Sequence, residues 1–141
     1  MDIRPLTDTL SVSPQITPSD LAALAAQGFR TVINNRPDGE EPGQPSSSAI
    51  AAAAAAAGLA YRHIPVVPGQ LQEAQVDGFA DALATLPGPA LAYCRTGTRS
   101  ATLWALQAAR RSPADSVLAS AREAGYDLSG IAPRLAAMRR D

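Results

Sequence analysis

The amino-acid sequence predicts an α/β fold with one mostly parallel central sheet of about four to five strands, flanked by helices. Three observations support this expectation. Short apolar runs at residues 29–34 and 89–93 have the character of buried strands. Longer stretches between the runs have apolar residues at helical spacing, and glycine or proline marks the breaks. A chain of 141 residues is long enough for one real core, so we expect a single catalytic domain over residues 1–141.

The expected elements follow in chain order. Residues 10–16 form a strand, and Pro14 within it favours an edge position. A helix with Thr17 as N-cap runs to Gly28, and residues 29–34 form a central parallel strand. An alanine-rich helix follows at 49–57, then a strand at 59–67, a helix at 71–86 and a strand at 89–93. The remaining helices are expected at 100–110, 114–124 and 131–140.

The loop after the last predicted strand contains Cys94, the only cysteine of the chain. Open α/β sheets bind ligands at the carboxyl ends of their strands, where this loop lies. Gly97 permits a turn that directs backbone N–H groups inward, and the following helix start adds to this anion site. The fixed charge of Arg99 suits an oxyanion and favours the reactive thiolate of Cys94. We therefore predict Cys94 and Arg99 as the catalytic residues.

The other residues of this loop are predicted to shape the anion site. Ser100 could donate a hydrogen bond to the sulfur or to a leaving thiolate, and two threonines could close the loop through their hydroxyls. The predicted anion-binding loop comprises Arg95, Thr96, Gly97, Thr98 and Ser100. The alternative is an inert, packed cysteine, which would not require Arg95 directly after it, Arg99 five residues on and Gly97 between them.

Residues 35–48 form the longest irregular stretch and follow a predicted strand, so they are expected at the same edge as the cysteine loop. Arg36, Asp38, Glu40 and His63 are candidates for the border of the pocket, with a solvated loop as the alternative for the first three. His63, the only histidine, could act as a base. We favour a structural role in which it is hydrogen-bonded beside the cysteine loop.

Two resemblances follow from these segments. The run YCRTGTRS at 93–100 is similar to the C-R-x-G-x-R-S loop of single-domain rhodaneses. Most of the chain, from about residue 9 to residue 108, resembles the beta-lactamase-hydrolase-like, phosphatase-like domain family, a branch of the cysteine phosphatase superfamily. The matching segments are VSPQI at 12–16, GFRTVIN at 28–34, RPDGE at 36–40 and HIPV at 63–66. This resemblance implies a fold like that of dual-specificity protein tyrosine phosphatases.

Two departures from the phosphatase pattern favour sulfur transfer. Cysteine phosphatases have five residues between cysteine and arginine, whereas only residues 95–98 separate Cys94 from Arg99, so one N–H is lost. The position of the general acid in dual-specificity phosphatases falls at Pro68, and the next carboxylate is Glu73. Asp38 or Glu40 could substitute for it.

The predicted activity is therefore that of a rhodanese-like sulfurtransferase, which carries sulfane sulfur as a Cys94 persulfide between a small sulfur donor and a thiol acceptor. Fusion of family members to metallo-β-lactamase-like domains that resemble persulfide dioxygenases points the same way. One alternative is a phosphatase that acts on a phosphorylated substrate through phosphocysteine at Cys94. Another is a non-catalytic anion-binding or redox-sensing domain.

Composition argues against several other classes of protein. A formal net charge of −1 gives no basic excess for nucleic acid. The longest apolar run, residues 49–60, is too short to span a membrane, and the first residues lack a signal pattern. One cysteine forms no intramolecular disulfide, so we expect a cytoplasmic protein. With one cysteine and one histidine, neither a metal site nor a cofactor is expected.

Overall fold

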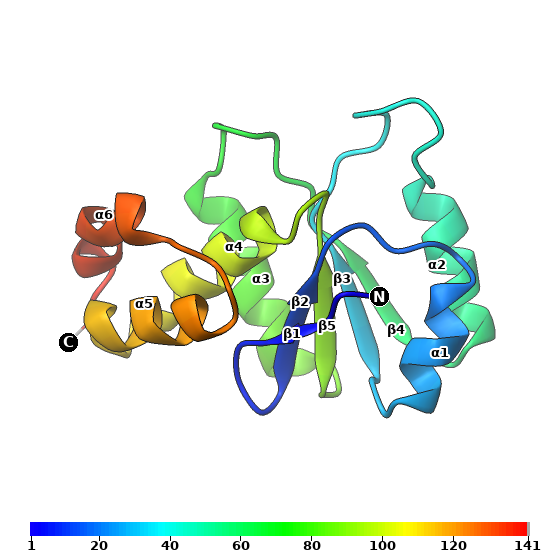
Figure 1. Ribbon diagram of the computed structural model, residues 1–141, viewed down its shortest axis with the longest axis horizontal. Helices are drawn as coiled ribbons and strands as arrows, with labels where there is room; N and C mark the ends of the chain where they lie inside the picture. The colour runs from blue at the N-terminus through cyan, green and yellow to red at the C-terminus, as the bar shows by residue number, and fades with distance from the viewer. Residues whose placement is uncertain (141) are drawn as a thin grey trace.

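A five-stranded sheet forms the centre of the computed structural model, which describes residues 1–140 (Figure 1). The strand order is β1-β2-β5-β3-β4. The strands are β1 (Arg4–Pro5), β2 (Leu10–Ser13), β3 (Thr31–Asn34), β4 (Ala60–His63) and β5 (Ala90–Tyr93). Strands β2, β5, β3 and β4 are mutually parallel, and β1 pairs antiparallel with β2. The expected α/β fold with a mostly parallel sheet is thus confirmed.

Helices cover both faces of this sheet (Figure 1). Helices α1 (Asp20–Ala26) and α2 (Ser47–Ala56) lie on one face, and α3 (Glu73–Thr85) and α4 (Thr98–Ala108) lie on the other. Beyond α4 pack α5 (Ala114–Glu123), a 3-10 turn at Ser129–Ile131 and α6 (Ala132–Ala137). No helix within residues 1–140 combines the length and the apolar character needed to cross a bilayer.

The alternation of side chains along the strands divides the core in two. Val32 and Leu91 belong to the cluster under α1 and α2, whereas Ile33 and Ala92 belong to the cluster under α3 and α4. All four of these side chains are fully buried. Full burial of a leucine-sized side chain contributes about 1.5–3 kcal/mol, so the strand that leads to Cys94 is anchored from both faces.

Three local expectations differ from the structure. The strand from Leu10 ends at Ser13, before Pro14, and it is not an edge strand because the short β1 pairs beside it. Thr17 does not cap α1; its backbone N–H donates to the Asp20 carboxylate at 2.8 Å, and the helix begins at Asp20. Helix α4 also begins earlier than expected, at Thr98, which brings Arg99 into its first turn.

Residues far from Cys94 in the sequence, Arg4 near the N-terminus and Tyr126 after α5, support the cysteine loop. The Tyr126 hydroxyl, which follows α5, donates to the Thr96 carbonyl at 3.4 Å. Arg4 lies over the Tyr126 ring, 5.7 Å from its centroid, and its Nη1 donates to the Ala124 carbonyl at 3.2 Å. Gly97 has a φ of +94°, and a Cβ at this position would overlap the Tyr126 hydroxyl. Glycine is therefore required here by both backbone conformation and space.

The substitution Gly97→Ala is expected to destabilise the protein more than Gly39→Ala. Both glycines have a positive φ, which costs roughly 1–2 kcal/mol with an added Cβ, but Gly39 has open space around it. The difference between the two losses, measured by urea unfolding, reports the overlap with Tyr126. Equal losses would mean that Tyr126 moves aside without cost and does not support the loop.

Candidate active site

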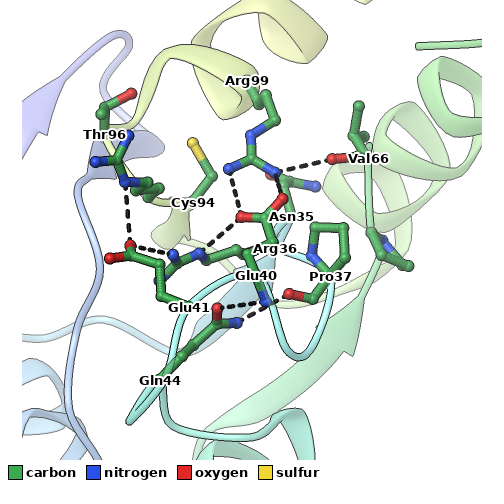
Figure 2. A network of polar contacts seen from close by, with 12 residues as sticks. Asn35, Arg36, Pro37, Glu40, Glu41, Gln44, Val66, Cys94, Thr96 and Arg99 are labelled. Atoms are coloured by element: carbon green, nitrogen blue, oxygen red, sulfur yellow. Dashed lines mark hydrogen bonds and ion pairs between the residues drawn. The ribbon is translucent and has the colours of Figure 1, made fainter. Parts of the chain in front are cut away.

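The Cys94 thiol lies at the carboxyl end of β5, directly before the start of α4. The residue is fully buried, and the Gly97 N–H donates to its sulfur at 3.1 Å. Figure 2 shows the sulfur beside the Arg99 guanidinium. The structure thus brings together the two residues predicted as catalytic, with a backbone N–H and a helix N-terminus next to the sulfur.

Arg99 is held in place by two acceptors. Glu40 binds both terminal nitrogens of the guanidinium, with Oε2 2.7 Å from Nη1 and Oε1 2.9 Å from Nη2. The Val66 carbonyl accepts the second hydrogen of Nη1 at 2.9 Å. Burial works against the charge of Arg99, but the hydrogen bonds to Glu40 and the nearby Cys94 sulfur outweigh it and raise the pKa of this arginine. A bidentate ion pair of this kind fixes the orientation of the guanidinium and also stabilises its positive charge.

Glu40 also binds a second arginine, Arg36, which follows β3. Its Oε1 accepts a hydrogen bond from Arg36 Nε at 2.8 Å. The Arg36 side chain is only 3% exposed, and its Nη1 donates to Gln15 Oε1 at 3.0 Å. Its Nη2 donates to Glu41 at 2.5 Å, so every nitrogen of this buried guanidinium has a partner. Such pairing is what a buried charge requires.

Glu41 continues the network to the rim of the site, where its carboxylate accepts from Arg95 Nε at 3.1 Å. Positive and negative groups therefore alternate around Cys94 (Figure 2). The hydrogen bond from Arg99, followed by that from Arg36, lowers the pKa of Glu40 against the opposing effect of burial. Hydrogen bonds from Arg36 and Arg95 lower the pKa of Glu41 in the same way. Both carboxylates are accordingly ionised at neutral pH.

The loop that carries Glu40 is tied down from several sides. Gln44 accepts from the Glu40 N–H at 3.1 Å and donates to the Pro37 carbonyl at 2.9 Å. His63 Nε2 donates to the Arg36 carbonyl at 2.9 Å. His63 therefore supports the 35–48 loop directly, and not the cysteine loop as expected.

Two further predicted residues lie differently from the expectation. Asp38 is exposed and accepts from the Ser47 N–H at 2.7 Å, so it caps α2 and does not border the pocket. The Ser100 hydroxyl donates to Asn35 Oδ1 at 2.8 Å, which leaves its hydrogen unavailable to the sulfur. The two loop threonines do form a local bond, with 3.1 Å between their Oγ1 atoms.

A shallow cavity of about 420 Å³ opens above these groups. It is lined by Arg36, Glu40, Glu41, Pro68, Arg95 and Arg99.

Sequence reasoning missed Glu41, Gln15 and Asn35. Gln15 and Asn35 could have been predicted, because both follow closely after a strand of the parallel sheet. The same argument identifies Arg36 as a candidate. Within residues 1–140, no group of three or more cysteine, histidine or acidic side chains is arranged to hold a metal ion.

The substitution Glu40→Gln is expected to lower the free energy of unfolding by about 1.5–3 kcal/mol at neutral pH, because two arginines lose a charged acceptor. The pKa of Glu40 is held below its ordinary value of 4.5 in the folded protein. Its contribution is therefore complete above pH 4.5 and is lost as pH falls below that value. Urea unfolding of both proteins across pH should show the difference shrinking on the acid side.

The exposed carboxylate of Glu123 on α5 provides the control. The substitution Glu123→Gln is expected to change stability little at any of these pH values. A Glu40→Gln protein that matched this control at pH 7 would contradict the role of Glu40 as the clamp on both arginines.

Comparison with known proteins places these residues in a family. Residues 2–111 match the family described as "Beta-lactamase hydrolase-like protein, phosphatase-like domain". The beta-lactamase hydrolase-like protein of Xylella fastidiosa (strain Temecula1) is 40% identical over 130 residues, which cover 91% of this chain and 30% of that protein. The corresponding protein of Agrobacterium fabrum (strain C58) is 42% identical over 101 residues, 72% of this chain and 23% of its own length. The chain thus spans less than a third of these curated relatives.

Solved structures agree with this result. The crystal structure of a candidate phosphatase from Neisseria meningitidis Z2491 has a TM-score of 0.88 and 37% identity, and 99% of each chain is covered. Tk-PTP, at 15% identity, covers 97% of this chain and 95% of its own with a TM-score of 0.71, which supports the fold alone. The resemblance inferred from the sequence is confirmed: this chain belongs to the family of phosphatase-like domains of the beta-lactamase hydrolase-like proteins.

Proposed function

We propose that this chain is a cysteine-dependent phosphatase, in which Cys94 accepts the phosphoryl group of a phosphorylated substrate. The sequence analysis preferred sulfur transfer and kept a phosphatase as the alternative. The comparisons favour the alternative, because the matching family is described as phosphatase-like and the relative at 37% identity is a candidate phosphatase. They give no support to the sulfurtransferase.

The free edge of the Arg99 guanidinium is the observation that carries this proposal. Glu40 and Val66 take both hydrogens of Nη1 and one of Nη2. The Nε hydrogen and the second Nη2 hydrogen lie together on the other edge of the planar group, which faces Cys94 in Figure 2. Two parallel N–H groups at this spacing suit two oxygens of one phosphoryl group. Glu40 therefore orients Arg99 without occupying the edge that a substrate would use.

The reaction follows from these positions. The Cys94 sulfur attacks phosphorus, the S–P bond forms, and the bond to the leaving oxygen breaks with its electron pair passing to that oxygen. Arg99 and the loop N–H groups hold the equatorial oxygens, where negative charge is concentrated. Water then attacks phosphorus, the S–P electron pair returns to the sulfur, inorganic phosphate leaves, and a proton passes to solvent.

The shortened loop is compatible with this reaction. Four residues between Cys94 and Arg99 supply one N–H fewer than five would, and the Gly97 N–H already donates to the sulfur. A guanidinium fixed by two acceptors compensates in part, since preorganised donors need no rearrangement during the reaction. The length of the loop, which favoured sulfur transfer, is in this proposal a variation within a phosphatase-like family.

The substitution Cys94→Ser tests the proposal. Hydrolysis of para-nitrophenyl phosphate by the purified protein is expected to fall by at least about 10³-fold, because the nucleophile is lost. Acid quenching during turnover should trap phosphate on wild-type protein, as seen by intact mass, and none on the variant. Turnover that survives the substitution would overturn the proposal.

A parallel incubation with thiosulfate or glutathione persulfide separates the two chemistries. A gain of one sulfur atom that thiol reverses, in a protein that does not release phosphate, would restore the sulfurtransferase. Helical content of Cys94→Ser should match that of the wild type, which excludes unfolding as the cause of lost activity.

A further inference from the structure

Cleavage of a phosphate ester leaves a negative charge on the departing oxygen, which many enzymes neutralise with a proton. A positioned general acid contributes typically 10²–10⁴-fold to the rate, and most for poor leaving groups. The groups that line the cavity beside Arg99 therefore influence which esters the proposed phosphatase can cleave.

Two carboxylates line this cavity, and neither holds a proton to give. Glu40 binds Arg36 and Arg99, and Glu41 binds Arg36 and Arg95. These contacts lower the pKa of both groups. If Arg99 turned toward a substrate, Arg36 would still bind Glu40, since its buried guanidinium is fixed by Gln15 and Glu41 as well. The three arginines of the cavity do not release a proton in proteins.

The turn between β4 and α3 also reaches the cavity. The Val66 carbonyl of this turn binds Arg99, and Pro68, two residues later, lines the cavity wall. A side chain at position 68 is thus well placed to meet a leaving group, but proline has no proton to transfer.

Four other polar side chains near the site are engaged elsewhere. His63 donates to the Arg36 carbonyl, and the Tyr126 hydroxyl donates to the Thr96 carbonyl behind the cysteine loop. Asp38 caps α2, and the Ser100 hydroxyl donates to Asn35. None of these four side chains lines the cavity.

We infer that the site acts on phosphoryl groups whose leaving group departs as a stable anion, and that it discriminates against alkyl phosphates such as phosphoserine. This inference rests on the proposed phosphatase function. Aryl phosphates and phosphoanhydrides share the required chemistry. A tyrosine-like phenol has a pKa of about 10 and a phosphate a second pKa of about 6, both lower than that of an aliphatic alcohol.

A series of leaving groups on the wild-type protein tests this inference. The probes are para-nitrophenyl phosphate, phenyl phosphate, O-phosphoserine and acetyl phosphate, the last representing the anhydrides. We expect kcat/KM to fall steeply as the leaving group becomes more basic, with at least about 100-fold between para-nitrophenyl phosphate and O-phosphoserine. Rapid cleavage of acetyl phosphate with slow cleavage of phenyl phosphate would identify anhydrides as the substrate class, and the reverse would identify aryl esters.

Pro68→Asp and Pro68→Asn form a matched pair that differs only in whether residue 68 can carry a proton. The ratio of O-phosphoserine to para-nitrophenyl phosphate turnover should be at least about 10-fold higher with Asp than with Asn. The pH profile of the Asp protein on O-phosphoserine should gain a decline on the basic side, which a merely structural change would not produce. Equal ratios in two folded variants would overturn the assignment of position 68.

The outcomes separate failure of this inference from failure of the proposed function. No Cys94-dependent turnover of para-nitrophenyl phosphate would remove the phosphatase itself. Turnover of para-nitrophenyl phosphate together with equally fast turnover of O-phosphoserine would keep the phosphatase and overturn the inference, since an unassigned acid would then be present. In that case, a steeper fall of kcat/KM with leaving-group basicity in Glu40→Gln than in the wild type would identify Glu40 as the acid.

Discussion

The parallel pairing of β5 between β2 and β3 decides where the residues of the candidate site lie. Parallel strands end at the same edge of the sheet, so Gln15, Arg36 and Cys94, which follow three different strands, all lie at that edge. The helices on the two faces of the sheet bury the side chains of β5, which leads to Cys94. The geometry of the candidate site is in this sense a consequence of the packing of the sheet.

The Glu40 carboxylate then fixes the orientation of the arginines that the sheet brings close together. Three arginines gathered around one cavity repel each other, and the two glutamates between them remove most of that repulsion. Because Glu40 takes the end of the Arg99 guanidinium, the edge toward Cys94 keeps its two donors for an anion. Without the Glu40 carboxylate, Arg99 would keep only the Val66 carbonyl as an acceptor, whereas Arg36 would still be held by Gln15 and Glu41.

Local features of the sequence predicted the centre of the site, and distant contacts decided its periphery. Cys94, Gly97 and Arg99 lie within six residues, so the turn and the helix start could be anticipated from residue types alone. Which acidic residue of the 35–48 loop faces inward depends on turns at Gly39 and Gly43, both with positive φ, and the sequence does not specify the direction of those turns. The sequence analysis therefore expects Asp38 at the pocket, but Asp38 caps α2, and Glu41, which was not expected there, lines the cavity.

The hydrogen-bond partner of Ser100, Asn35, is 65 residues away, and their contact depends on the register of β3 with β5. Pro14 favours an edge position for the strand from Leu10, but Pro14 follows β2, and the two-residue β1, too short to leave a periodic pattern, takes the edge.

The remaining question is whether a cation can replace the proton that Pro68 does not supply. Arg95 is the arginine at the rim of the cavity, but its side chain is 62% exposed and already paired with Glu41. An exposed ion pair contributes little in water, because solvent screens it and the long side chain must be ordered. Arg36, although buried, has all its nitrogens engaged by Gln15 and the two glutamates. In the proposed phosphatase, charge stabilisation of the leaving oxygen would therefore be weak, whereas stabilisation of the transferred group by Arg99 would be strong. Such an imbalance would make the reaction depend on substrates with a good leaving group.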